Sequence, residues 1–203
     1  MFNLTQQELC LLNRLNTPGK IQDYLDSIPM NHERGGVTCL SPRQVMRERR
    51  AYCLEGAMFA ALALRLHGHP PLVMDLSSSP HDYDHVVALY KRHGCWGAIS
   101  KTNHAVLRYR EPIYRTLREL ALSFFHEYLD DDGNKTLRSY SVPVDLSRFD
   151  KQDWMTNEDG NWFVVKSLYE AKHYPLLNRA QIASLRKAHA MEIKAGDMLE
   201  WRK

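Results

Sequence analysis

Residues 51–68 read AYCLEGAMFAALALRLHG, and this stretch decides the fold. Over Leu54–Leu66 the side chains are apolar on nearly every face, which predicts a buried central helix rather than a surface helix. Gly68 ends that helix, and the double proline at 70–71 prevents its continuation. Cys53 stands at its beginning. The sequence therefore places a thiol at the N-terminus of a buried helix.

Three shorter helices are predicted before this one. Thr5 with Glu8 forms a capping box, and the pairs Thr17-Pro18 and Ser41-Pro42 each place an N-cap residue before a proline at the first helical position. These signals predict helices over about 6–14, 18–28 and 42–50.

After the central helix the hydrophobic period changes to that of strands. Short apolar runs predict strands over 72–76, 85–90, 95–100 and 105–109, with a tight connection at 92–94. Pro112 then predicts the start of a long helix to about Leu129, and a last helix is expected near 179–194.

Helices followed by a meander of strands indicate an α+β fold rather than alternating βαβ units. We expect residues 1–130 to form the core with its N-terminal helices. Residues 131–203 are expected to form a C-terminal extension packed on that core.

The candidate chemistry is a thiol with an imidazole. A helix N-terminus carries partial positive charge and unpaired N–H groups, so a lowered pKa is predicted for Cys53. About 30 residues later, His85 begins a strand. From that strand the imidazole can complete an ion pair with the thiolate.

The expected strand register predicts a third residue of the site, one that orients the imidazole of His85. If residue 91 pairs with residue 96, His85 lies opposite Thr102 and diagonal to Ser100 on the same face. A slip of one residue brings Asn103 onto that face instead. Either Ser100 or Asn103 can therefore orient the imidazole.

The run CLEGAMFAAL from Cys53, the exit at Gly68–Pro70 and the run DHVVAL from Asp84 resemble the transglutaminase-like superfamily. The resemblance covers about residues 40–105, and the chain is similar to bacterial proteins that carry this domain. It implies a papain-like core, in which a central helix that begins at the cysteine packs on a small antiparallel sheet.

By the same resemblance, the nucleophile of the family falls on Cys53 and its base on His85. The third residue of the family is usually Asp, and its position, four residues after Trp96, falls on Ser100. Asn103 would match the triad of papain-type enzymes, which carry Asn there.

Composition excludes several classes of protein. Of 203 residues, 27 are Lys or Arg and 24 are Asp or Glu, a balance that argues against nucleic acid as a partner. No apolar run approaches the roughly 18 residues of a membrane span. The N-terminus lacks the pattern of a secretory signal, and the four cysteines show no CxxC spacing, so a cytoplasmic protein with reduced thiols is expected. No metal or cofactor is expected.

These observations favour cysteine-dependent acyl transfer or hydrolysis of peptide or protein amides, through the Cys53 thiolate and His85. The alternative is a transglutaminase-like fold that has lost catalysis and acts as a protein-binding module. The serine at position 100 favours that alternative, because a hydroxyl supplies no negative charge to an imidazolium.

Overall fold

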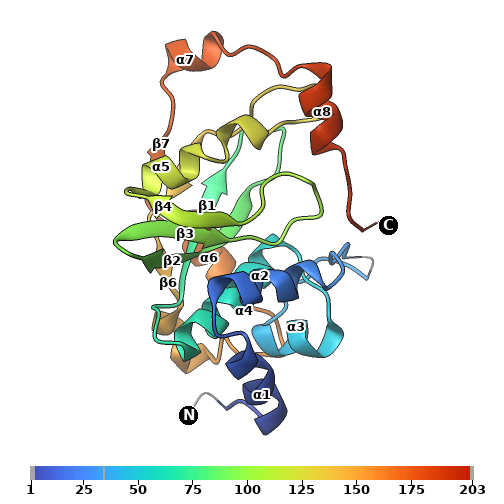
Figure 1. Ribbon diagram of the computed structural model, residues 1–203, viewed down its shortest axis with the longest axis vertical. Coiled ribbons are helices and arrows are strands. Elements are labelled where there is room, and N and C mark those ends of the chain that lie inside the picture. The colour runs from blue at the N-terminus through green and yellow to red at the C-terminus, as the bar shows by residue number, and fades with distance from the viewer. Residues whose placement is uncertain (1–2, 34, 202–203) are drawn as a thin grey trace.

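One antiparallel sheet runs through the molecule, with helices on both of its faces (Figure 1). The computed structural model describes residues 3–33 and 35–201. Within them the strands follow the order β4-β3-β2-β1-β5-β7, and β6 pairs with β1 as well. Helices cover the sheet, so the fold is α+β.

The strands are β1 (Leu72–Ser77), β2 (His85–Arg92), β3 (Cys95–Ile99), β4 (Arg110–Tyr114), β5 (Ser139–Ser141), β6 (Val144–Asp145) and β7 (His173–Pro175). The α-helices are α1 (Gln6–Arg14), α2 (Pro18–Asp26), α3 (Pro42–Glu48), α4 (Cys53–Leu66), α5 (Leu117–Leu122), α6 (Trp162–Glu170), α7 (Arg179–Ala183) and α8 (Ala190–Gly196). Two 3₁₀ segments, η1 (Phe125–Glu127) and η2 (Leu146–Gln152), complete the chain.

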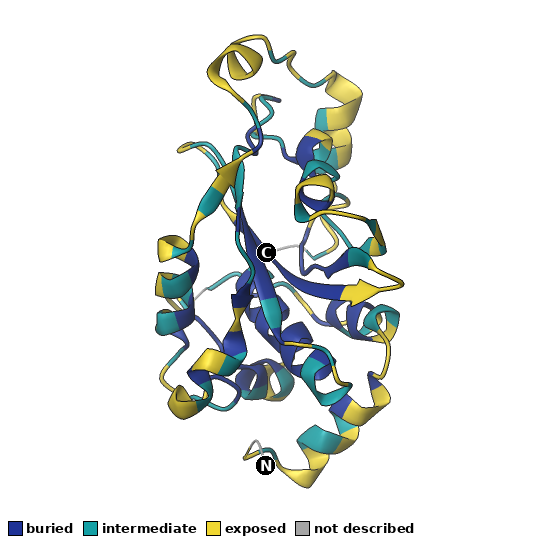
Figure 2. Cartoon of the chain, turned by 90° about the vertical axis from the view of Figure 1, so that its left-hand side faces the viewer, coloured by how far each residue is buried: buried dark blue, intermediate teal, exposed yellow. Residues whose placement is uncertain are grey.

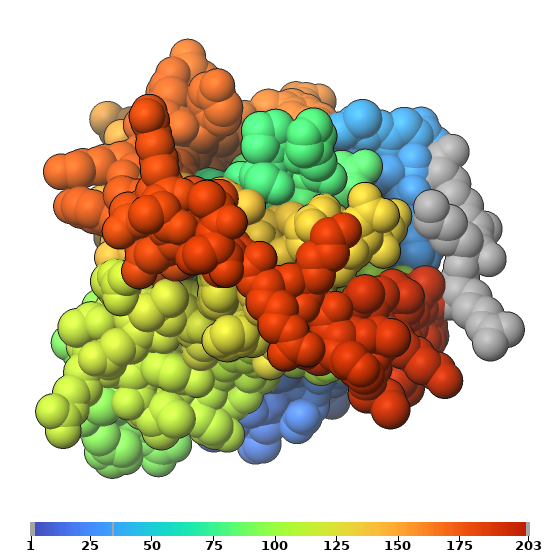
Figure 3. Space-filling view, turned by 90° about the horizontal axis from the view of Figure 1, so that it is seen from above, coloured from blue at the N-terminus to red at the C-terminus, as the bar shows by residue number. Residues whose placement is uncertain are grey.

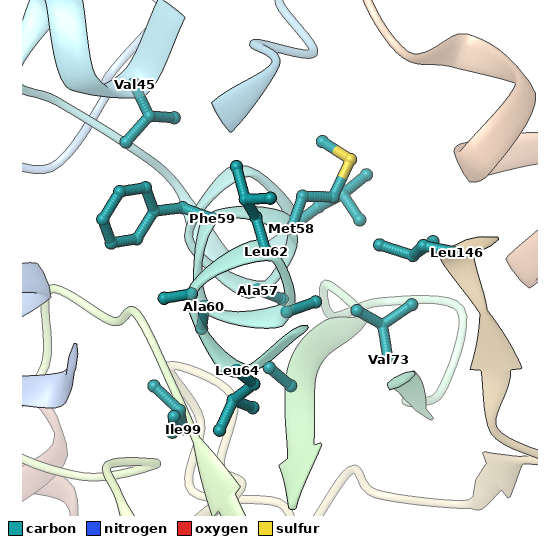
Figure 4. Packing of buried hydrophobic residues seen from close by; sticks show 14 of the residues in the cluster. Val45, Ala57, Met58, Phe59, Ala60, Leu62, Leu64, Val73, Ile99 and Leu146 are labelled. Carbon is teal, nitrogen blue, oxygen red and sulfur yellow. The ribbon is translucent and has the colours of Figure 1, made fainter. Parts of the chain in front are cut away.

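Helix α4 is the predicted central helix, and the structure confirms it. Its first turn begins at Cys53, and all residues from Leu54 to Leu64 are buried. Figure 4 shows its side chains packed against Val45 of α3 on one side and against Val73 and Ile99 of the sheet on the other.

The two faces of the sheet are covered by different helices, as Figure 1 shows. On β2, Val86 and Ala88 belong to the hydrophobic cluster around α4, whereas Val87 and Leu89 belong to the cluster around α5. Figure 2 shows this buried interior surrounded by exposed outer helices. The alternation fixes which side of the sheet each residue of the site faces.

The hairpin register is the one that the sequence predicts. Lys91 pairs with Trp96, and the ladder continues to Ala88 opposite Ile99.

Two predicted elements between residues 105 and 129 are wrong. Residues 105–109 are irregular, and the strand that follows is Arg110–Tyr114. Pro112 lies in this edge strand, where a missing N–H costs little, and does not begin a helix. Helix α5 begins instead after Thr116, whose side chain caps it in a box with Glu119.

The C-terminal part of the chain joins the sheet and then crosses the surface. Strands β5 and β7 extend the sheet beyond β1. The helix predicted over 179–194 is two short helices, because the backbone at Ala188 turns to pair with Gly133 and a new cap forms at His189. Figure 3 shows this segment lying across the top of the molecule. Among the described helices, none is long and apolar enough to span a membrane.

A close contact between Gly56 and Lys101 holds α4 against the loop that follows β3. A Cβ at Gly56 would lie 2.5 Å from Cβ of Lys101. The Lys101 side chain is fully buried, and its Nζ donates to the carbonyl oxygens of Leu25 and Ile28, at 2.8 and 2.6 Å, where α2 ends.

We expect Gly56→Ala to destabilise the protein by about 1–3 kcal/mol, because the overlap with Lys101 outweighs the gain in helix propensity. Gly19→Ala is the matched control, since Gly19 is also helical and has open space around it. That variant should be neutral or stabilised by up to about 1 kcal/mol. Urea unfolding measures both, and equal effects of the two substitutions would contradict the packing described.

Candidate active site

Glu55 fixes the beginning of helix α4. Its carboxylate is fully buried and accepts hydrogen bonds from the backbone N–H of Tyr52 and of Leu40, both at 2.9 Å. The side chains of Asn31 and Thr38 donate to it as well, at 2.9 and 2.8 Å. One carboxylate therefore ties the loop before α3 to the turn that carries Cys53.

Cys53 lines a cavity of about 440 Å³. The cavity lies between the start of α4, strands β1 and β2, and helix α6. Trp162 and Tyr169, two exposed aromatic residues of α6, form part of its wall, and Asp75 and His173 supply polar groups. The cavity gives the thiol both access and an adjacent space for a substrate.

The expectation of a lowered pKa for Cys53 is wrong. Burial raises the pKa of the thiol to about 11, and the carboxylates of Asp75 and Glu55 act in the same direction. The backbone N–H groups of Val86 and Leu54 point at the sulfur and oppose this rise. Desolvation of the thiolate outweighs the donors that the helix terminus provides, so Cys53 is a neutral thiol at neutral pH.

His85 and Ser100 meet as the predicted register requires. Both are buried, and Nε2 of His85 lies 2.7 Å from Oγ of Ser100. By the alternation of β2 and β3, the two side chains share the face of the sheet that α5 covers. Of the two candidates for the third residue, the structure brings Ser100 to the imidazole.

The imidazole is neutral as well. Burial, with smaller contributions from the charges of His104 and Arg110, lowers the pKa of His85 to about 4. The predicted thiolate–imidazolium ion pair is therefore replaced by an uncharged thiol and an uncharged imidazole.

Cys53 and His85 approach each other through the peptide group that joins residues 85 and 86. The thiol comes from the α4 side of the sheet to the N–H of Val86, the residue directly after His85. Within the described residues no hydrogen bond joins the sulfur to the His85 ring, and His85 does not line the cavity. The ring atom Nδ1 of His85 makes no hydrogen bond to the described part of the chain.

The imidazole that lines the cavity belongs to His173, which sequence reasoning missed. Its Nε2 lies 3.0 Å from Oδ2 of Asp75, and its Nδ1 lies 2.8 Å from the carbonyl oxygen of Ala171. Asp75 carried a signal, as a charged residue inside an apolar strand. His173 carried none, because only the pairing of β7 with β5 and of β5 with β1 brings it there.

Asn103 binds the backbone of Trp201 rather than the imidazole of His85. Its side-chain amide accepts from the backbone N–H of Trp201 and donates to the carbonyl oxygen of Trp201, both at 2.8 Å. Asn103 thus binds the C-terminal segment and makes no hydrogen bond to His85 among the described residues.

No protein-family model matches the sequence, and no curated protein is significantly similar to it. In the described part of the chain, no three His, Cys, Asp or Glu side chains are grouped as metal ligands.

The buried neutral state of His85 predicts a loss of stability in acid. Its pKa of about 4 in the folded protein lies below the ordinary value of 6.5. Between these values the unfolded chain binds more protons, so stability is complete above pH 6.5 and falls as the pH drops toward 4. This one group should account for about 3 kcal/mol of that loss.

Urea unfolding at pH 7 and pH 4 measures the effect. His85→Asn should lose about 3 kcal/mol less than the wild type between the two pH values. His93→Asn, at an exposed turn position with φ of 51° that asparagine tolerates, is the control and should match the wild type. The same pH dependence in wild type and His85→Asn would show that His85 is not buried in its neutral form.

Proposed function

We propose that the protein is a cysteine-dependent acyltransferase or hydrolase of amide substrates, with a transglutaminase-like core. The observation that carries this proposal is a thiol at the start of a buried helix, in a cavity, one peptide group away from a histidine whose Nε2 contacts a buried hydroxyl. Peptide or protein amides are the proposed substrates.

Because both groups are neutral, the first step is general-base catalysis rather than attack by a preformed thiolate. The Cys53 sulfur forms a bond to the carbonyl carbon of the amide, and the carbonyl electron pair moves to the oxygen. The thiol proton passes to Nδ1 of His85, a step that requires substrate binding to bring the ring and the sulfur, which lie on opposite sides of the sheet, within hydrogen-bond reach. Cys53 is the first residue of α4, so its own N–H is free of the helix ladder and can bind the oxyanion. The N–H of Val86 is directed to the same sulfur and is the second proposed donor.

In the second step the imidazolium returns the proton to the leaving nitrogen as the C–N bond breaks, which leaves a thioester on Cys53. Water or an amine then attacks the thioester and gives its proton to Nδ1. When the C–S bond breaks, the proton returns to the sulfur and the free thiol is restored.

His85 suits the role of base better than His173 does. Both ring nitrogens of His173 are engaged with oxygen atoms, those of Asp75 and of the Ala171 carbonyl, and neither makes a hydrogen bond to Cys53 in the described part of the chain. His85 uses only Nε2, toward Ser100. We assign His173 and Asp75 to the wall of the substrate cavity.

The second candidate function is a protein-binding module that keeps the fold without catalysis. This second candidate is favoured by the absence of charge on Cys53, His85 and Ser100. Position 100 holds a hydroxyl in place of a carboxylate, and the raised pKa of Cys53 keeps the thiol protonated. A thiol and an imidazole in this state react slowly unless a bound substrate positions them.

Turnover of amide substrates separates the two candidates. A library of glutamine-containing peptides and peptide anilides is incubated with the protein, with and without a primary amine, and mass spectrometry follows cleavage and transfer. Cys53→Ala should abolish turnover, and His85→Ala should lower it by about 10²- to 10⁴-fold.

Cys95→Ala is the matched control, since Cys95 is a partly exposed thiol at the β3 turn, and it should leave turnover unchanged. Turnover that survives in Cys53→Ala would refute the proposed nucleophile. A folded wild type with no turnover and no thioester on Cys53 for any substrate would favour the binding module.

A further inference from the structure

The hydroxyl of Ser100 lies between the imidazole of His85 and a backbone carbonyl oxygen. Its Oγ is 2.7 Å from Nε2 of His85 and 2.6 Å from the carbonyl oxygen of Leu107. Ser100 is fully buried, so these two bonds satisfy the hydroxyl without solvent.

Counting protons assigns each bond a direction. A carbonyl oxygen only accepts, so the single proton of the Ser100 hydroxyl is donated to Leu107. Toward His85 the hydroxyl must then act as acceptor, which requires the imidazole proton to be on Nε2. The lone pair of the ring consequently lies on Nδ1.

We propose that Ser100 and the Leu107 carbonyl act together as a positioning pair, which holds His85 as the Nε2–H tautomer with Nδ1 as the free base. This inference rests on the proposed function, because Nδ1 is the atom that takes the Cys53 proton. The Ser100 hydroxyl thus orients the imidazole, a role that a carboxylate usually has in the transglutaminase-like superfamily.

The surroundings of Leu107 hold its carbonyl in place. Leu107 has φ of 59°, in the left-handed region that costs a branched side chain about 1–2 kcal/mol. Its N–H donates to the Glu127 carboxylate at 2.8 Å, and the same oxygen of Glu127 pairs with Arg110 at 2.6 Å. An unfavourable backbone conformation that is fixed on both sides indicates a carbonyl whose direction matters.

The C-terminal segment holds the loop 103–108 on either side of Leu107. Ala105 donates its N–H to the carbonyl of Met198 at 3.0 Å, and Arg108 pairs with Glu200 at 2.8 Å. The two hydrogen bonds between Asn103 and Trp201 complete the attachment. Asn103 therefore contributes to the site through the loop, rather than by touching the imidazole.

The geometry also explains why position 100 carries a hydroxyl. A carboxylate there would direct an acceptor oxygen at the acceptor oxygen of Leu107, and one of the two would lose its partner in a buried site. Serine or threonine satisfies both neighbours, whereas ionised aspartate satisfies only His85.

Nitrogen-15 NMR of histidine-labelled protein at pH 7.5 tests the inference. The His85 signals are assigned by their loss in His85→Asn. We expect Nε2 to carry a proton that is protected from exchange with water, and Nδ1 to carry none. Ser100→Thr should keep that signal. Ser100→Ala should lose the protected proton, and the turnover that depends on Cys53 should fall at least about tenfold.

A wild-type spectrum with the proton on Nδ1, or a protected Nε2–H that persists unchanged in Ser100→Ala, would overturn the inference. The wild-type spectrum needs no variant and no substrate, so the inference can fail while the proposed function stands. The reverse also holds, since a protein with the expected tautomer but no turnover would refute the function alone.

Ser100→Asp tests whether the carbonyl of Leu107 takes part in orienting His85. We expect a lower unfolding midpoint in urea than for Ser100→Thr, and no gain in the alkylation rate of Cys53 at pH 7. If Ser100→Asp is as stable as the wild type and its Cys53 reacts faster, the Leu107 carbonyl has no part in orienting His85.

Discussion

The register of the β2–β3 hairpin is the constraint on which the rest of the site depends. With Lys91 opposite Trp96, His85 and Ser100 share one face of the sheet, and Val86 turns to the other face, where α4 packs. A slip of one residue between β2 and β3 would take Ser100 to the other face of the sheet and separate it from His85. Each face is packed from its own set of side chains, so a slip would place these side chains against the wrong neighbours.

Burial gives the site its chemical character. The helix terminus and the N–H of Val86 would stabilise a thiolate, yet removal of the sulfur from water costs more, and the pKa of Cys53 rises to about 11. The same effect lowers the pKa of His85 to about 4. A hydroxyl between a ring N–H and a carbonyl suits such an uncharged site, because it satisfies both neighbours without adding a charge that must be desolvated.

The sequence predicted the parts of this site that depend on local pattern. The apolar composition of 54–66 identifies α4, and the turn at 92–94 sets the register that brings Ser100 to His85. It could not predict His173, which reaches the cavity through two strand pairings. Pro112 was misread because proline suits an edge strand as well as a helix start. The direction of the Cys53 pKa shift depends on how deeply the thiol is enclosed, which no local pattern records.

The most direct test of this account is the pH dependence of iodoacetamide labelling at Cys53, in wild type and in His85→Ala, resolved by mass spectrometry. We expect a rate that climbs as the pH approaches about 11, the pKa of the thiol, with no plateau in the neutral range. The apparent pKa should be the same in both proteins, and the exposed Cys10 provides an internal reference. A plateau below pH 8 that disappears in His85→Ala would reveal a thiolate–imidazolium pair and contradict the neutral site described.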